Sequence, residues 1–229
     1  MTPKPFALVL FIGAALLLSF KPLGAADAKP GKLRVFLLAG QSNMEGQAVV
    51  DLDHDENYNG GRGTLAKLLE EPEFEARWGW VRDGEGEWQA REDVGVWYRS
   101  AHEEKKGPLS IGYAVYGGRH HFGPELALGK VLGDRFDDPV LLVKACWGGK
   151  SLHVDFRPPS AGGEVGPYFG RMFEELDAAL ADVGAAFPEW KELEPVVEGF
   201  VWFQGWNDGC DGEATRSYAG NLERLIGDV

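Results

Sequence analysis

Three short segments of the chain combine a nucleophile, small residues and amide groups, which are the residue types that acyl transfer requires. They are 40–44 (Gly-Gln-Ser-Asn-Met), 148–151 (Gly-Gly-Lys-Ser) and 204–208 (Gln-Gly-Trp-Asn-Asp). A serine at a strand-to-helix turn exposes its hydroxyl, and the helix-start amides that follow can face a developing oxyanion. Glycines let backbone N–H groups approach a substrate closely. Together the segments indicate a serine nucleophile, Ser42, with several donors converging on one carbonyl oxygen.

Each segment also has a simpler interpretation when it is taken alone. Ser42 could be only a helix N-cap, and Gly148-Gly149 only a tight turn. We expect the aromatic side chains in and just before the third segment, Trp202, Phe203 and Trp206, to pack in the core rather than to bind sugar. His153, in the loop after the second segment, is expected at the surface or behind the site rather than as a catalytic base.

The sequence indicates no metal site and no other cofactor. The pair His120-His121 lacks further ligands at zinc spacing. The acidic loop 51–56 lacks the Gly and the terminal Glu of an EF-hand. A Gly-rich phosphate loop, which a flavodoxin-like nucleotide-binding protein would need, does not follow the first predicted strand.

Each of the three segments follows a mostly apolar run that reads as a buried parallel strand, at 33–39, 139–145 and 196–203. Helical patterns lie between or after these runs, at 64–70, 124–132, 168–183 and 218–226. This alternation predicts a three-layer α/β/α sandwich around a parallel sheet, with ligands bound at the carboxyl ends of the strands. The segment 71–118, rich in Trp and Gly, is expected to form one or two short hairpins that wall one side of the cleft.

From Leu33 to its end the chain resembles the sialate O-acetylesterase and carbohydrate esterase family 6 branch of the SGNH hydrolases. The resemblance is carried by 40–44, by Gly-Gly-x-Ser and by Trp-Phe-Gln-Gly-x-x-Asp at 202–208. It implies a flavodoxin-like fold and metal-independent deacetylation of carbohydrate. It also implies Ser42 as the nucleophile, with oxyanion donors from the Ser42 amide, the Gly149 amide (Gly148 is the alternative) and the Gln204 side chain. The substrate-binding residues that it suggests are Gln41, Asn43, Gly148, Glu125 and Asp208.

Two departures from the family pattern affect the functional prediction. Trp206 stands where the family commonly has Glu. The chain ends at Gly227-Asp228-Val229 without the Asp-x-x-His segment that supplies the catalytic histidine, and none of the five histidines lies in such a motif. We therefore expect a domain that lacks its C-terminal strand and helix and is inactive or a fragment. The alternative is a non-catalytic carbohydrate-binding domain that retains the cleft.

Composition and the first residues bear on localisation and partners. The chain has 229 residues and a net charge of −13, which disfavours binding to nucleic acid and to anionic membranes. The apolar run from Phe6 to Phe20 is shorter than the roughly 20 residues that span a bilayer, so residues 1–28 read as a cleaved signal peptide; an uncleaved membrane anchor is the alternative. We therefore expect residues 29–229 to form a secreted or periplasmic domain, with no membrane contact after cleavage. Its two cysteines, Cys146 and Cys210, are then permitted to form a disulfide, although their spacing does not show that they meet.

Overall fold

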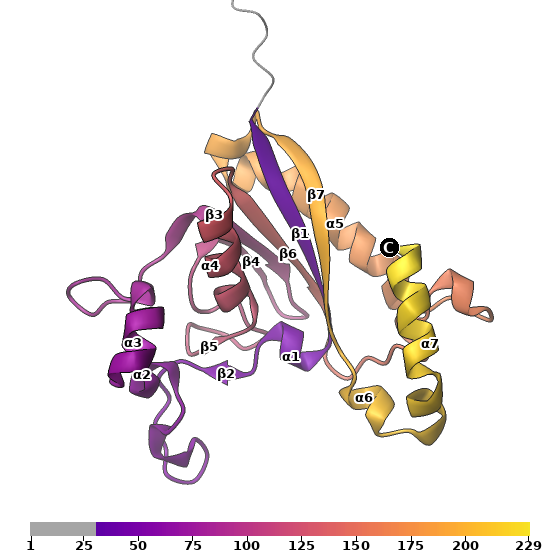
Figure 1. Ribbon diagram of the computed structural model, residues 1–229, viewed down its shortest axis with the longest axis horizontal. Coiled ribbons are helices and arrows are strands. Elements are labelled where there is room, and N and C mark those ends of the chain that lie inside the picture. The colour runs from indigo at the N-terminus through magenta and orange to yellow at the C-terminus, as the bar shows by residue number, and fades with distance from the viewer. Residues whose placement is uncertain (1–30) are drawn as a thin grey trace, which may run out of the picture.

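A five-stranded sheet forms the centre of the molecule in the computed structural model, which describes residues 31–229 (Figure 1). The predicted signal peptide lies outside the described residues. The strand order is β4-β3-β6-β1-β7. Strands β3, β6, β1 and β7 run parallel, and β4 runs antiparallel to β3. Their bounds are β1 Lys32–Gly40, β3 Arg91–Arg99, β4 Glu104–Leu109, β6 Val140–Cys146 and β7 Glu194–Phe203.

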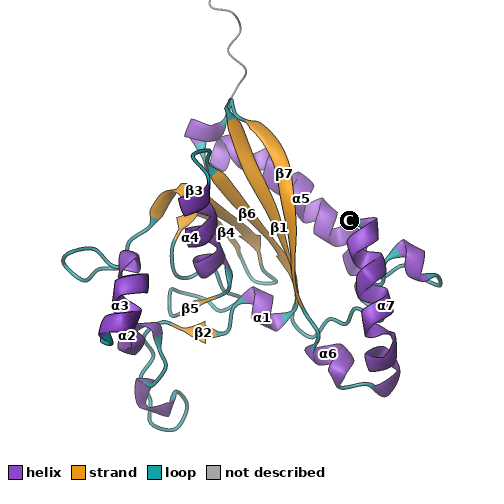
Figure 2. Cartoon of the chain, in the orientation of Figure 1, coloured by secondary structure: helices purple, strands orange, loops and turns teal. Residues whose placement is uncertain are grey.

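Helices cover both faces of this sheet (Figure 2). The α-helices are α1 Ser42–Glu45, α2 Leu65–Leu68, α3 Pro72–Trp78, α4 Glu125–Arg135, α5 Pro167–Ala186, α6 Trp206–Gly209 and α7 Gly212–Asp228. Four 3₁₀ turns, η1 Asn59–Gly61, η2 Gly79–Val81, η3 Pro159–Ala161 and η4 Pro188–Trp190, and a small sheet of β2 Ala48–Val49 with β5 His121–Phe122 complete the described elements. No helix among residues 31–229 is long and apolar enough to cross a membrane.

Strand β1 shows how the sequence builds two cores. Its alternate side chains Leu33, Val35 and Leu37 join α5 and α7 in one buried cluster, because successive residues of a strand point to opposite faces. Phe36 and Leu38 join α4 in the other cluster. The near-continuous apolar run is therefore the signature of a strand that is covered on both sides. The predicted α/β/α fold class is confirmed.

The segment 71–118 is placed differently from our expectation. It contains helix α3, an antiparallel bridge between Arg82 and Trp88, and the hairpin β3–β4, which extends the central sheet. Strand β3 pairs in parallel with β6 over Val94–Tyr98, where its side chains are buried. The charged start of β3 (Arg91-Glu92-Asp93) and Gly95 interrupt the apolar pattern, which conceals a buried strand of about average length.

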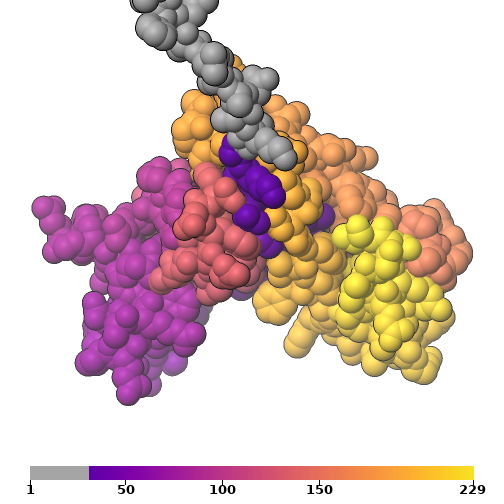
Figure 3. Space-filling view, turned by 45° about the horizontal axis from the view of Figure 1, so that its top comes forward, coloured from indigo at the N-terminus to yellow at the C-terminus, as the bar shows by residue number. Residues whose placement is uncertain are grey.

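Strand β7 forms one edge of the sheet, and nothing pairs with its outer side within residues 31–229. Figure 3 shows it at the surface beside β1. Val197 is 53% exposed, although such an apolar side chain is usually buried. A groove of about 470 Å³ runs between β7, α5 and α7, and Phe200 and Ile226 line it.

The two cysteines are not bonded to each other. Cys146 ends β6 and is buried, whereas Cys210 follows α6 and is exposed. Burial raises the pKa of the Cys146 thiol to about 12, which makes it unreactive near neutral pH.

Candidate active site

The three segments singled out in the sequence meet at the carboxyl edge of the sheet. Ser42 follows β1, Gly148 follows β6 and Asn207 follows β7, and β1 lies between the other two strands. A Cβ atom placed on Gly148 would lie 3.8 Å from the Ser42 Cβ. The Asn207 side-chain amide donates to the Gly149 carbonyl, and Gln41 Nε2 donates to Asn207 Oδ1 at 3.2 Å. Residues that are far apart in the chain thus form one compact site.

Ser42 is half-buried and is the first residue of α1. The N-cap of α1 is Gln41, so Ser42 does not have the capping role that was its simpler interpretation. No hydrogen bond within residues 31–229 engages its hydroxyl, which leaves the oxygen free to attack. Gly40 permits the close approach of β7 just before Ser42, because a Cβ at that position would collide with the Phe203 carbonyl.

The Gly148-Gly149 turn has the conformation that close backbone approach requires. Gly149 has φ +72°, a value that side-chain-bearing residues rarely adopt. The turn lies next to Ser42 at Gly148, whose backbone amide hydrogen-bonds to the Glu45 carboxylate, and the role of the Gly149 amide as an oxyanion donor stays a prediction. Gly149 lies beside Asn207, whose Nδ2 would be 4.0 Å from a Cβ on that glycine.

Gln204 does not aim its amide at Ser42, contrary to our expectation. Its Nε2 donates to the Lys150 carbonyl at 3.0 Å and to Asp208 Oδ2 at 2.6 Å. An amide nitrogen carries two hydrogens, so both are used. Because the Gln204 amide is hydrogen-bonded to the buried Asp208 carboxylate, we interpret Gln204 as a structural residue instead of an oxyanion donor.

Asn207, to which the sequence analysis gave no role, is better placed to be the third donor. Its Nδ2 uses one hydrogen on the Gly149 carbonyl, and its Oδ1 is fixed by Gln41. The second hydrogen is therefore free and held in a defined orientation beside the glycine turn. The sequence feature that could have identified Asn207 is its position in the third segment, three residues beyond Gln204.

Gln41 and Asp208 are positioning residues rather than substrate contacts. Only 2% of Gln41 and 1% of Asp208 is exposed. The Gln41 side-chain oxygen accepts from the backbone amides of Gly205 and Asn207 at 3.3 Å. The Asp208 carboxylate accepts from the backbone amides of Leu152 and His153 at 2.8 Å. These bonds join the loops after β1, β6 and β7 to one another.

Glu125 is also buried, and the expectation that it contacts substrate is wrong. It forms an ion pair with Lys144 at 2.7 Å, and both side chains are 0% exposed. Lys144 Nζ also donates to the carbonyls of Glu45 at 3.1 Å and Tyr113 at 2.5 Å. The pair therefore anchors the end of α1, one helical turn after Ser42.

Glu45 places a second buried carboxylate close to Ser42. It is 7% exposed, and its Oε2 would lie 2.9 Å from a Cβ on Gly148. Burial raises the pKa of Glu45, while the Gly148 amide, Lys144 and His102 act in the opposite direction. The carboxyl group is thus in contact with the Gly148-Gly149 turn and accepts a hydrogen bond from the Gly148 amide.

None of the five histidines is hydrogen-bonded to Ser42 within the described residues. His153 Nδ1 lies 2.9 Å from Ser217 Oγ on α7, which agrees with the expected place behind the site. His120 contacts Asp51 at 2.7 Å, and the His121 ring packs at a tilt against Tyr116 with ring centroids 4.5 Å apart. His102 lies in the β3–β4 turn, at the same edge of the sheet as Ser42. Within the part of the chain that the structure describes, no group of three ligands could hold a metal ion.

The aromatic residues in and just before the third segment differ in environment. Trp202 packs edge-on against Phe156 with ring centroids 5.0 Å apart, as expected for a core residue. Phe203 is 46% exposed and Trp206 is 75% exposed, so the expectation of core packing is wrong for these two. Phe203 and Asn43, the residue that follows Ser42, line a groove of about 390 Å³.

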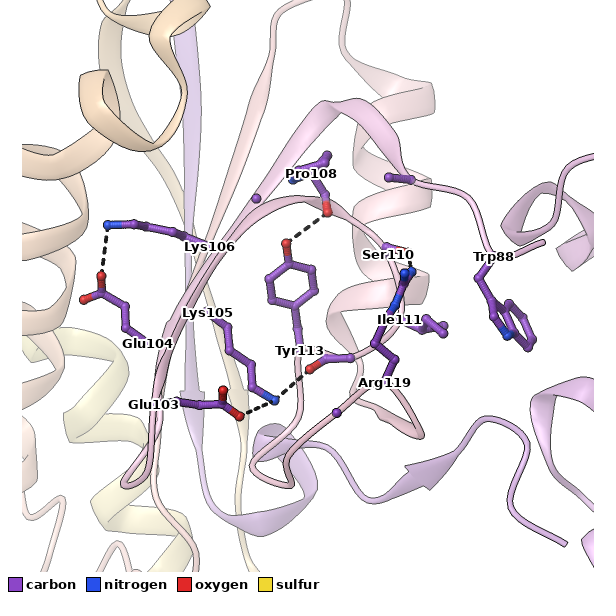
Figure 4. A pocket seen from close by; sticks show the side chains of 14 residues that line it. Trp88, Glu103, Glu104, Lys105, Lys106, Pro108, Ser110, Ile111, Tyr113 and Arg119 are labelled. Atoms are coloured by element: carbon purple, nitrogen blue, oxygen red, sulfur yellow. Dashed lines mark hydrogen bonds and ion pairs between the residues drawn. The ribbon is translucent and has the colours of Figure 1, made fainter.

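A second cavity, of about 620 Å³, lies away from these segments (Figure 4). Trp88, Lys105, Tyr113 and Arg119 line it, and none of the sequence-predicted site residues does. Lys105 Nζ is already held by Glu103 at 3.2 Å and by three backbone carbonyls. The cavity therefore offers no group that the chemistry at Ser42 would use.

The site combines a serine after β1 with amide groups that follow the two neighbouring strands, β6 and β7. This arrangement on an α/β/α fold is typical of the α/β serine hydrolases. Within this class, the chain belongs to the SASA family, described as carbohydrate esterase, sialic acid-specific acetylesterase, whose model matches residues 32–229.

Solved structures that are similar to this chain include two proteins. A protein from Arabidopsis thaliana is 20% identical, with a TM-score of 0.50 over 86% of this chain and 67% of that one. A carbohydrate acetylesterase from Xanthomonas citri is 14% identical, with a TM-score of 0.40 over 85% of this chain and 38% of that one. A comparison with curated proteins gives no match. The similarity to the Arabidopsis thaliana protein shows the fold alone.

Proposed function

We propose that the protein is a carbohydrate O-acetylesterase that works through an acyl-enzyme at Ser42. The observation that carries the proposal is the convergence of Ser42, Gly149 and Asn207 at one edge of the sheet. The Ser42 hydroxyl would attack the acetyl carbonyl carbon, and the sugar oxygen would leave with a proton. Water would then release acetate from Ser42.

The oxyanion of each tetrahedral intermediate would be held by three donors. They are the backbone amides of Ser42 and Gly149 and the side-chain amide of Asn207. These donors are fixed before substrate arrives, because Gln41 and Asp208 join their loops. Such preorganised donors supply a large share of the rate enhancement in acyl transfer.

The described residues include no evident base that would accept the proton of the Ser42 hydroxyl. No histidine is hydrogen-bonded to Ser42 in the described residues, so we expect the 29–229 protein to be slow without help. Loss of a triad histidine leaves only the residual catalysis of the oxyanion hole and of binding. On p-nitrophenyl acetate, the protein should act little better than its Ser42→Ala variant.

Chemical rescue by imidazole tests the proposal. We expect free imidazole to serve as the base and to stimulate acetate release from an O-acetylated sugar by the protein. The Ser42→Ala variant is the matched control, because it removes only the nucleophile and reports the reaction of imidazole alone. Absence of any Ser42-dependent acetate release, with and without imidazole, would contradict the esterase proposal.

The lack of a histidine contact at Ser42 favours a second candidate, a carbohydrate-binding domain without catalysis. In that case the sugar would bind beside Ser42 with the same affinity in the protein and in Ser42→Ala, and no acetate would appear. Titration calorimetry beside the acetate assay separates the two candidates.

We also propose that the protein is exported to the periplasm or the medium, with cleavage near residue 28. The support is the basic start, the apolar run and the small residues of the first 28 positions. Mass spectrometry of the exported protein tests this. Recovery of the intact chain from the cytoplasm would contradict it.

A further inference from the structure

Glu45 is a buried acidic residue on the same short helix as Ser42. The two residues lie three positions apart in α1, a spacing that places side chains on one face of a helix. Both side chains meet the glycine turn after β6 at one point. A Cβ atom on Gly148 would lie 2.9 Å from Glu45 Oε2 and 3.8 Å from the Ser42 Cβ. The carboxylate therefore lies beside the nucleophile and against the turn.

The carboxylate occupies the space that a side chain at position 148 would need. A Cβ closer than 3.0 Å to another heavy atom is essentially never observed, so Gly148 and Glu45 fit each other only as this pair. The Gly148 amide donates a hydrogen bond to the carboxylate. The next amide, that of Gly149, donates to no group within residues 31–229. Glu45 thus uses one amide of the turn and leaves the other for a substrate.

The backbone of Glu45 is fixed from two sides. Its amide donates to the Gln41 carbonyl at 3.0 Å, and its carbonyl accepts from Lys144 Nζ at 3.1 Å. Lys144 is held in turn by its fully buried ion pair with Glu125. Because both backbone groups are engaged, the residue cannot turn away from the glycine turn without breaking bonds to its neighbours. The orientation of the carboxylate is therefore built into α1.

A turn of two glycines needs such support from outside. Glycine is the most flexible residue, and the turn has no side chain of its own that could pack. Asn207 holds it from the β7 side through the Gly149 carbonyl, and Glu45 holds it from the α1 side. Catalytic groups have to be held within about 0.5 Å of the productive geometry. A misplacement of about 1 Å can cost about 10²-fold in rate.

We infer that Glu45 is a positioning residue, whose carboxylate holds the Gly148-Gly149 turn so that the Gly149 amide faces the oxyanion formed at Ser42. The inference rests on the proposed function and adds a residue to the same site. In this role Glu45 does not touch the substrate. Glu45→Gln keeps an oxygen that can accept from the Gly148 amide, whereas Glu45→Ala leaves that amide without a partner.

The first test observes the Gly148 amide by NMR. The sequence contains two Trp-Gly pairs, Trp78-Gly79 and Trp147-Gly148. Labelling Trp with ¹³C at the carbonyl and Gly with ¹⁵N therefore selects the Gly148 amide and one internal reference, Gly79. We expect the Gly148 signal to shift with pH as Glu45 ionises, and to lose this shift in Glu45→Gln.

The variant Glu45→Gln also separates Glu45 from the other titratable groups around it. These groups come from α4, β3, β6 and the β3–β4 turn, and they are Glu125, Tyr98, Lys144, Cys146 and His102. All of them remain in Glu45→Gln, so a shift that one of them causes would persist in that variant.

The second test compares kcat and KM for imidazole-supported, Ser42-dependent acetate release. A folded Glu45→Ala variant should lose about tenfold to about 10²-fold in kcat with little change in KM, and Glu45→Gln should retain most of the parent kcat. Glu175→Ala is the matched control, because Glu175 is similarly buried but pairs with Arg99 at 3.3 Å instead of contacting the turn. It should leave kcat unchanged, and circular dichroism reports whether each variant is folded.

A Gly148 signal that does not shift with pH, or that shifts equally in Glu45→Gln, would overturn the inference. A folded Glu45→Ala variant with the kcat of the parent would also overturn it. A Gly148 shift that depends on Glu45, together with the loss of kcat in Glu45→Ala, supports it. If the parent shows no Ser42-dependent acetate release, the esterase proposal fails, and the Gly148 signal still decides whether Glu45 holds the turn.

Discussion

At the scale of single residues, Asn207 has the clearest expected effect on chemistry. Its amide is oriented by Gln41 and by the Gly149 carbonyl, with one hydrogen left for an oxyanion. Removing one such donor lowers kcat by about 10²–10³ in other acyl-transfer enzymes. We expect Asn207→Ala to lower the imidazole-supported, Ser42-dependent rate of acetate release by a similar factor. Saturation kinetics would show the loss in kcat, and a variant as fast as the parent would exclude Asn207 from the oxyanion site.

Glu45 makes stability depend on pH in a predictable direction. Burial raises its pKa above the ordinary value of 4.5, so between that value and the raised one the folded protein retains a proton that the unfolded chain has lost. Stability from this group therefore falls as pH rises through that window. Lys144 and His102, which face the carboxyl group, reduce the effect without reversing it.

Glu45→Gln should remove this dependence. We expect its free energy of unfolding, relative to that of the parent, to increase between pH 4.5 and 7. Urea unfolding at several pH values measures the difference, and Glu85→Gln, at an exposed loop position, is the control. Parallel stability curves for the parent and Glu45→Gln would contradict the assignment.

At the scale of elements, the Glu125–Lys144 pair joins α4, β6 and the end of α1. Both charges are fully buried, so removing one leaves the other without compensation. Such a loss costs about 3–5 kcal/mol. We expect Lys144→Met to destabilise the protein by this amount and to lower Ser42-dependent activity, because Lys144 also holds the Glu45 carbonyl at 3.1 Å.

The double variant Lys144→Met with Glu125→Leu separates charge from packing. Because it leaves no buried charge unpaired, we expect it to recover much of the stability that Lys144→Met loses. Urea unfolding of the parent, both single variants and the double variant completes the cycle. Additive losses in the double variant would show that the two side chains act independently.

The elements also show what could be predicted from the sequence. The apolar runs at 33–39, 139–145 and 196–203 identified β1, β6 and β7, and parallel strands bring their carboxyl ends to one edge. That reasoning was sufficient to place Ser42, Gly148 and the third segment together. Strand β3 was not identified in this way, because the strand begins with charged residues and Gly95 interrupts the apolar pattern of its buried part.

The direction of individual side chains could not be predicted in the same way. Gln204 and Asp208 have the residue types of a donor and a substrate ligand, but they hydrogen-bond to each other at 2.6 Å. Glu125 is oriented by Lys144, which lies 19 positions away in sequence. Such choices depend on partners that become neighbours only in the folded chain, so a local pattern does not specify them.

At the scale of the whole molecule, β7 presents an open edge with apolar side chains. Unpaired backbone groups at such an edge can pair with another chain. We expect the 29–229 protein to associate as its concentration rises. Val197→Lys, which places a charge on the exposed edge, should shift the equilibrium towards monomer. Sedimentation velocity measures both, and a parent that stays monomeric at every concentration would contradict the prediction.

The central place of β1 in the sheet has a consequence for the order of folding. Both of its neighbours, β6 and β7, lie far downstream in sequence, so a growing chain exposes the nucleophile strand long before either partner has been synthesised. Contacts of such long sequence separation form slowly, because the intervening chain must first be ordered. Helices α4 and α5 contain only local backbone bonds and can form earlier. The three joined loops around Ser42 are then among the last features to form. During refolding, the recovery of ligand binding should therefore lag behind the recovery of the helical circular dichroism signal.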